Sequence, residues 1–334
     1  MNNRKKILLL IILISGSTIF GQEQFRVMTY NVLNYPSKIS STRNPYFAKV
    51  IEAVNPDILI VQEMESITGV TMFHEDVLDS SYSAGAFING NDTDNALFYK
   101  DSVFDFIDNT PIKTALRDIA QLTLVYKNSG DTLIIYSAHL KASDGATNEQ
   151  KRLAEVNNLR AVTDKLSPNM NYMLVGDFNF YNSTEPGFQK LLDKTKPGYF
   201  LDPINKIANW HNNSIYRSIH TQSTRLTSLS DEGSTGGLDD RFDMILVSQA
   251  VIDSGSITYL PNSYTTFGND GNHFNRALIE LPNATVSNDI ATALYYASDH
   301  LPVYADFVLE PLTSIKDDEA ELIIDDFELF QNYP

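Results

Sequence analysis

The stretch Ser298-Asp299-His300-Leu301-Pro302-Val303 places a carboxylate beside an imidazole. Directly after it, residues 303–309 form an apolar run that predicts a β-strand. A strand end is a rigid mount, so both side chains can be aimed at a common point. Asp next to His can serve metal binding and proton transfer, but the dipeptide alone is weak because most such pairs are solvated loop residues. The rest of the chain has to supply matching groups.

Polar side chains also stand at the ends of the other expected strands. These strands are expected at 25–31, 58–62, 95–99, 122–126, 133–137, 172–175 and 242–247. The polar groups at their ends are Asn31, Glu63, His139, Asp177, Asn179 and Asp243. Each alone is open to a plainer interpretation, as a turn residue, an exposed acid or a structural histidine. If the strand ends share one edge of a sheet, the groups converge on one site.

Helical patterns lie between these strands. The pair Asn44-Pro45 predicts a helix over 46–54, and apolar residues at spacings of three and four predict another over 149–166. Alternating helices and paired strands are typical of a mixed α/β protein. The stretches 227–238 and 269–275, rich in small and polar residues, are expected to be long surface loops.

The N-terminus predicts export. A basic start, Met1-Asn2-Asn3-Arg4-Lys5-Lys6, precedes a short apolar run and small residues, which is typical of a secretory signal peptide over residues 1–21. The run is shorter than the roughly 20 residues of a membrane span, and the alternative is an uncleaved anchor. The chain has no cysteine, so stability must come from its core rather than from disulfides. We therefore expect a secreted or cell-surface protein, a monomer without stable membrane insertion.

Charge and residue types narrow the chemistry. The formal net charge of −17 opposes long-range attraction to nucleic acid or to anionic membrane, although bound divalent cations can still hold a polyanion. Oxygen ligands such as Glu63, Asp299 and Asn31 suit Mg²⁺ or Mn²⁺. The imidazoles of His139 and His300 can divide proton donor and base roles at a phosphate. No Gly-x-x-x-x-Gly-Lys-Ser/Thr loop supports nucleotide-driven phosphoryl transfer.

Six segments together resemble the endonuclease/exonuclease/phosphatase family, of which deoxyribonuclease I is the best known member. In chain order they are Thr29-Tyr30-Asn31-Val32-Leu33, Pro56-Asp57-Ile58 through Gln62-Glu63, Ser137-Ala138-His139-Leu140-Lys141, Gly176-Asp177-Phe178-Asn179, Arg241-Phe242-Asp243-Met244-Ile245 and the stretch from Ser298 to Val303. The resemblance implies a four-layer α/β sandwich, two packed mixed β-sheets flanked by helices, with a catalytic domain over residues 22–310. It also implies metal-dependent phosphoester hydrolysis by in-line attack of water.

The resemblance assigns roles residue by residue. The implied metal ligands are Glu63, Asn31 and Asp299, for Mg²⁺, with Mn²⁺ or Ca²⁺ as alternatives. The implied catalytic residues are Asp177 and Asn179 at the attacking water, His139 and His300 at the scissile phosphate, and Asp243 at the transition state or leaving group. Arg117 is the implied phosphate contact. Asp94 is a candidate carboxylate partner for His139, although Asn95 beside it leaves that role open.

A second resemblance concerns the C-terminus. Residues 311–334 contain an acidic linker and then Phe327 to Pro334, which looks like the truncated start of a type IX secretion sorting domain. The alternative is a frayed acidic tail. The resemblance implies the secretion machinery as a partner.

Three functions remain open from the sequence. The first is an exported nuclease that hydrolyses DNA or RNA. The second is a sphingomyelinase-like lipid phosphodiesterase or a small-molecule phosphatase on the same fold. The third is a non-enzymatic surface-binding module, whose mark would be loss of groups such as Glu63 or His300, and none is lost.

Overall fold

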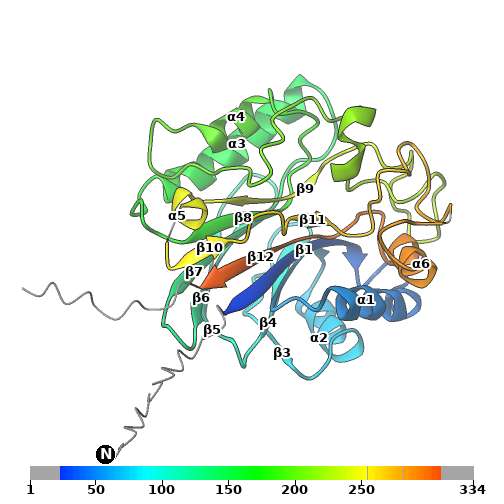
Figure 1. Cartoon of the computed structure of the whole chain (residues 1–334), viewed down its shortest axis with the longest axis horizontal. Helices are drawn as coiled ribbons and strands as arrows, with labels where there is room; N and C mark the ends of the chain where they lie inside the picture. The colour runs from blue at the N-terminus through cyan, green and yellow to red at the C-terminus, as the bar shows by residue number, and fades with distance from the viewer. Residues whose placement is uncertain (1–22, 254, 281, 310–334) are drawn as a thin grey trace, which may run out of the picture.

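The computed structural model describes residues 23–253, 255–280 and 282–309, where two β-sheets pack face to face and helices cover both outer faces (Figure 1). This confirms the expected four-layer α/β sandwich. Within the described ranges, no helix is long and apolar enough to cross a membrane. The expected signal peptide, acidic linker and sorting segment lie outside the described residues.

Both sheets are mixed. The first has the order β10-β12-β1-β2-β4-β3, with β11 paired to β12, and the second the order β5-β6-β7-β8-β9. The first sheet consists of β1 (Gln24–Tyr35), β2 (Ile58–Met64), β3 (Tyr82–Ala84), β4 (Asp94–Lys100), β10 (Ile257–Tyr259), β11 (Thr265–Thr266) and β12 (Val303–Leu309). The second consists of β5 (Phe104–Ile112), β6 (Ile119–Tyr126), β7 (Thr132–His139), β8 (Tyr172–Asp177) and β9 (Asp243–Val247). Only β1–β2 and β7–β8 are parallel pairs.

The helices divide between the two outer faces. They are α1 (Ser40–Val54), α2 (Ile67–Asp76), α3 (Ala146–Thr163), α4 (Pro186–Leu192), α5 (Gln249–Ile252), α6 (Asn288–Ala297) and the 3₁₀ turn η1 (Ser214–Ile219). Helices α1, α2 and α6 share a core with the first sheet, and α3 and α4 share one with the second. The central strands of each sheet are therefore buried on both faces.

The middle core follows the two-residue period of the strands. In β8, Met173 and Val175 enter the core between the sheets, whereas Tyr172 and Leu174 enter the core beneath α3 and α4. All four are buried, and burying a large apolar side chain stabilises a fold by about 1.5–3 kcal/mol. A shift of one residue in the pairing of β8 would reverse both faces, so its register is firmly set.

Several sequence-based boundaries differ from the structure, and some elements were not expected. Helix α1 begins at Ser40 rather than at residue 46, because Asn44 accepts a hydrogen bond from the Tyr35 hydroxyl instead of capping a helix. Helix α3 begins three residues earlier than expected and follows Gly145, whose carbonyl accepts from the backbone of residues 148 and 149. The polar strand β5 was not expected, because an edge strand needs only a few buried residues.

The two expected surface loops are partly buried. In the 227–238 stretch, Asp231 is buried and pairs with buried Arg225 at 2.6 Å. In the 269–275 stretch, Asn269 donates to the carbonyls of Arg217 and His220. A polar composition did not mean exposure, because these polar groups find partners inside the protein.

Gly176 sets how closely β7 and β8 approach. A Cβ atom at this position would lie 2.0 Å from the carbonyl oxygen of Ala138, its partner in β7, and the glycine has a φ of 133°. A side chain would therefore have to push the two strands apart, directly beside the paired residues His139 and Asp177.

We predict that Gly176→Ala destabilises the protein by about 2–4 kcal/mol, from backbone strain plus overpacking. The matched control is Gly130→Ala, which also has a positive φ but meets nothing within 4 Å, so it should cost only about 1 kcal/mol. Urea unfolding of the three proteins measures both effects. Equal losses in the two variants would contradict the close approach of β7 and β8.

Candidate active site

In each central strand, alternate side chains point into the space between the two sheets. These side chains are apolar along most of the strand and become polar at one edge of both sheets. In β7 the series runs Leu133, Ile135, Ser137, His139, and in β8 it runs Met173, Val175, Asp177. In β1 it runs Val27, Thr29, Asn31, and β9 begins with Asp243 before Ile245. The strand pairs β7–β8 and β8–β9 set His139 and Asp243 directly opposite Asp177. The convergence expected from the sequence is therefore present.

A hydrogen-bonded polar layer separates this edge from the apolar core. The Thr29 hydroxyl donates to Gln62 Oε1 at 3.1 Å, and Gln62 Nε2 donates to Ser137 Oγ at 3.2 Å. Ser137 in turn donates to Asn95 Oδ1 at 2.9 Å. All four side chains are buried, so the chain of bonds links the two sheets directly under the site.

Asn31 joins the two sheets within the site itself. Its Nδ2 donates to Glu63 Oε1 at 3.0 Å and to Asp177 Oδ2 at 3.1 Å, while its Oδ1 accepts from the backbone of Leu33. The backbone of Asn34 donates to the second Glu63 oxygen at 2.9 Å. One amide thus fixes a carboxylate from each sheet.

Two buried carboxylates resist ionisation here. Burial, followed by the negative charge of Asp299, raises the pKa of Glu63. Burial also raises the pKa of Asp177 to about 7, with Asp243 and Glu63 adding to the effect and His300 opposing it. The site therefore concentrates negative charge in a place where water cannot compensate it.

The two histidines are held in opposite states of protonation. Burial would lower the pKa of His300, but the charges of Asp243 and Asp299 outweigh it and raise that pKa well above its ordinary value. Burial lowers the pKa of His139 far below its ordinary value, and the positive charge of Arg117 adds to this. At neutral pH one imidazole is a proton donor and the other is a neutral acceptor.

Asp243 lies behind His300 rather than at the pocket wall. Its Oδ2 is 2.7 Å from His300 Nδ1, which leaves Nε2 of the imidazole to face the pocket. The structure thus gives Asp243 a position from which it orients His300. His139 has no such partner, since its buried Nδ1 has no hydrogen bond within the described residues. Asp94 instead accepts from the backbone of Gly90, so it does not orient His139.

Gln222 is a site residue that the sequence analysis missed. Its Nε2 lies 3.1 Å from Asp299 Oδ2 and 2.6 Å from His300 Nε2, and Asp299 also accepts from the backbone of Ser234. The amide nitrogen suits the Asp299 carboxylate, whereas protonated His300 donates from Nε2 and needs the amide oxygen, so the Gln222 amide has to turn when His300 is protonated. Gln222 therefore couples the two residues of the Asp-His pair. It stands in an irregular segment outside every strand, so no strand-end pattern marks it.

Asn179, which follows β8, and Arg117, which precedes β6, both bond to the backbone at the end of β7. Asn179, with a φ of 52°, donates to the carbonyl of Leu140 at 3.3 Å and lines the pocket. Arg117 donates to the carbonyl of His139 at 3.1 Å and pairs with Asp92. Its guanidinium is thus engaged with the backbone that carries His139, and it is not among the pocket-lining residues.

The donor set fits a divalent cation. Ligand atoms of Glu63, His139 and Asp177 lie within 4.8 Å of one another. They line a cavity of about 340 Å³ together with Asp299, and none of the described lining residues is Lys or Arg. Clustered carboxylates without a cation repel one another, and a hard dication would relieve this. Asn31 offers its Nδ2 to two carboxylates, so its oxygen would serve as a ligand only after that amide turned.

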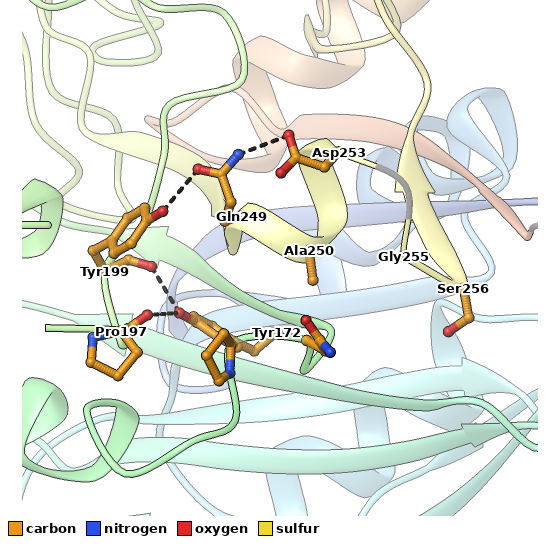
Figure 2. Close-up of a pocket in the computed structure, with 10 residues that line it drawn as sticks. Tyr172, Pro197, Tyr199, Gln249, Ala250, Asp253, Gly255 and Ser256 are labelled. Carbon is orange, nitrogen blue, oxygen red and sulfur yellow. Dashed lines mark hydrogen bonds between the residues drawn. The ribbon is translucent and has the colours of Figure 1, made fainter.

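A larger cavity, of about 590 Å³, lies at the opposite end of β8 (Figure 2). There the Tyr172 hydroxyl donates to the carbonyl of Tyr199 at 2.8 Å, the Tyr199 hydroxyl donates to Gln249, and Gln249 donates to Asp253. These polar groups satisfy one another. Size alone therefore does not identify the reactive site, whereas the unbalanced charges in the smaller cavity do.

Comparison with known proteins agrees with this geometry. Residues 28–300 match the family model described as "Endonuclease/Exonuclease/phosphatase family". No curated protein sequence matches the chain.

Solved structures of the same fold are similar at low identity. A family protein from Bacteroides thetaiotaomicron has a TM-score of 0.56 at 16% identity, with 87% of this chain and 100% of that chain covered. D. rerio TDP2 complexed with a single-strand DNA product has a TM-score of 0.56 at 15% identity, covering 86% and 99%. The human Nocturnin catalytic domain with bound sulfate has a TM-score of 0.52 at 19% identity, covering 86% and 95%.

We predict that Asp243→Asn lowers the pKa of His300 in metal-free protein, because the largest charge that raises it is removed. A histidine with a raised folded-state pKa adds stability that is complete below its unfolded pKa of about 6.5 and is lost as pH rises through the folded value. The variant should therefore lose stability mainly at neutral pH and below. NMR titration of the His300 ring measures the shift.

The matched control is Asp306→Asn. Asp306 lies on β12, and its carboxylate pairs with Arg26 of β1 and not with a histidine. If the titration of His300 is the same in Asp243→Asn as in the unaltered protein, Asp243 does not set the protonation state of His300.

Proposed function

This chain belongs to the endonuclease/exonuclease/phosphatase family, and on that premise we propose that it is a divalent-metal-dependent phosphodiesterase whose substrate is nucleic acid. The observation that carries the proposal is the pair of unlike histidines around one carboxylate. Asp177 Oδ2 lies 3.6 Å from His139 Nε2 and 3.8 Å from His300 Nε2. A phosphate entering this pocket would meet a proton acceptor and a proton donor together.

The metal would be held by Glu63, with His139 or Asp177 and Asp299 as further candidates. When bound, a hard dication such as Mg²⁺ or Mn²⁺ would stabilise negative charge that develops on the phosphate oxygens. The polar layer beneath the site and the amide of Asn31 would keep these ligands in place.

The protein's own residues supply the proton transfers. The oxygen of a water forms a bond to phosphorus, and Asp177, whose pKa of about 7 suits a base, takes the water's proton. The bond from phosphorus to the ester oxygen breaks on the opposite side, and protonated His300 gives its proton to that oxygen. Asp243 holds the imidazole throughout. Transfer from Asp177 to His300, across 3.8 Å, then restores both groups.

The charge around the pocket favours a second candidate, a hydrolase of small phosphoesters or lipid headgroups. Described residues that line the pocket include Glu232 and three further acids, but no Lys or Arg. A protein that tracks a long polyanion normally neutralises its phosphates with Lys and Arg. The similarity of fold to TDP2 with a single-strand DNA product supports the nucleic-acid proposal.

Export is part of the proposal. The basic and apolar start over residues 1–21 supports secretion, and residues 327–334 support delivery by a type IX machinery to the cell surface or medium. We propose a monomer that does not insert stably into a membrane.

We predict that His300→Ala lowers kcat on plasmid DNA or RNA with Mg²⁺ by about 10²–10⁴-fold, since positioned acid–base groups contribute that much. The matched control is His74→Ala in α2, whose ring contacts the carbonyl of Tyr82 away from the site, and it should keep its activity. Parallel assays with sphingomyelin and p-nitrophenyl esters separate the two candidate functions. Full activity in His300→Ala would refute the mechanism.

We predict that Mn²⁺ at 100 times its Kd stabilises the protein by about 2.7 kcal/mol, seen as a rise in Tm that a chelator reverses. Glu63→Gln should abolish this rise because it removes the central carboxylate. The control is Glu65→Gln, whose carboxylate accepts hydrogen bonds from Ser37 outside the metal cluster. If Mn²⁺ does not raise the Tm of the unaltered protein, the proposed metal site is contradicted.

A further inference from the structure

Tyr181 is an aromatic residue of the pocket wall to which no role has been assigned. It follows the motif Gly176 to Asn179 by two residues and lines the cavity with Asp177, Asn179 and His300. Its side chain is half-buried. A flat ring thus stands beside the place where the phosphate would bind.

The ring of Tyr181 is held in position from several directions. Its centroid lies 5.1 Å from those of His211 and Phe242, both in T-shaped arrangements. The guanidinium of Arg152, which is buried, lies 5.8 Å from the ring centroid. An aromatic side chain fixed in this way loses little conformational entropy when a ligand binds.

The backbone of Tyr181 is equally fixed. Its N–H donates to Glu185 at 2.8 Å, and Glu185 is paired with Arg152 at 2.8 Å in a buried ion pair. Its carbonyl accepts from the backbone of His211 at 3.2 Å. Tyr181 is therefore part of the preformed pocket and not of a loose surface loop.

The cations nearest the pocket are already engaged. Lys38 is paired with Glu232 at 2.6 Å, Lys141 donates to the carbonyl of Ala142, and Arg117 is paired with Asp92. Lys38 and Arg117 are paired with carboxylates, whereas the Lys141 ammonium bonds to a neutral carbonyl and its charge helps to lower the pKa of His139. Among the residues just named, the rim therefore offers an aromatic ring and a single positive charge that no carboxylate neutralises. Such a surface would recognise an uncharged flat group more readily than further phosphates.

We propose that Tyr181 stacks against the nucleobase next to the scissile phosphate, so that the pocket recognises one phosphate and one base rather than a run of phosphates. This rests on the proposed function and narrows its substrate class to short or terminal single-stranded nucleotides. Stacking of a base on an aromatic side chain is tolerant of sequence, because every base has a flat face. The acidic rim would disfavour duplexes, whose many phosphates need matching cations.

The test uses a dinucleoside monophosphate and two analogues in which one base or the other is replaced by hydrogen. We measure kcat/KM with Mg²⁺ for the unaltered protein and for the Tyr181→Phe and Tyr181→Leu variants. Matched controls are Tyr199→Phe and Tyr199→Leu, because Tyr199 lies in the distant cavity of Figure 2. The readout is the ratio between intact and base-deleted substrate, which a general loss of folding would not change.

The expected ratio for one of the two base positions is at least about fivefold in the unaltered protein, as stacking predicts. Tyr181→Phe and both Tyr199 variants should keep this ratio, and Tyr181→Leu should bring it close to one. A ratio near one in the unaltered protein, or a ratio kept in Tyr181→Leu, would overturn the assignment of Tyr181.

A ten-nucleotide strand tests the second half of the proposal. Its kcat/KM should stay within about tenfold of that of the dinucleotide, and a larger gain would overturn recognition of a single phosphate. Hydrolysis of bis(p-nitrophenyl) phosphate without hydrolysis of any nucleotide would leave a phosphodiesterase but overturn its nucleic-acid substrate, and the role of Tyr181 with it. The failure of the role of Tyr181 and the failure of the proposed nucleic-acid substrate therefore give different experimental results.

Discussion

The register of β8 between its two neighbours is the constraint on which the site depends. Parallel pairing with β7 sets His139 opposite Asp177, and antiparallel pairing with β9 sets Asp243 opposite the same residue. Gly176 permits this by letting the backbone of β7 approach where any side chain would collide. Because a slip of one residue would turn Asp177 away from the space between the sheets, the apolar core that fixes the register also fixes the chemistry.

The same alternation explains how a dry core can end in a charged site. Inward positions change from aliphatic residues to a hydrogen-bonded layer that includes Gln62 and Ser137, and only then to Asn31 and Asp177. In the hydrogen-bonded layer, each polar side chain has a partner, and these hydrogen bonds compensate for the loss of water on burial. This compensation ends at the outermost layer. There the carboxylates have too few positive partners, and their raised pKa values record the cost. A folded protein keeps such an arrangement where a ligand completes it.

The strands and the polar groups at their ends could be predicted from sequence. The alternation of apolar residues along a strand and the place of a polar residue at its end are both visible in a short stretch of sequence. The six segments lie where β1, β2, β7, β8, β9 and β12 meet the site, and the four-layer fold was expected from them. Gln222 and Tyr181 could not be found in this way. Both stand in irregular segments whose path depends on distant contacts, such as the pairing of Gln222 with Asp240 and His300. For the same reason the buried part of the 227–238 loop, such as Asp231, could not be foreseen.

The residues that local sequence patterns reveal are those proposed for the chemistry. The residues whose positions depend on distant contacts are those proposed for substrate specificity. The groups proposed to move protons stand on strands or close beside them, since Asp177 ends β8 and His300 precedes β12 by three residues, and regular elements hold side chains more precisely than loops do. Groups that would meet the rest of the substrate, such as Tyr181 and Glu232, stand on connections whose length and polarity can change without disturbing the sheets. Structures of 15–19% identity share the fold with this chain, and a shared fold does not fix what the connections recognise. For this chain, we propose that the ring of Tyr181 and the acidic rim carry substrate preference.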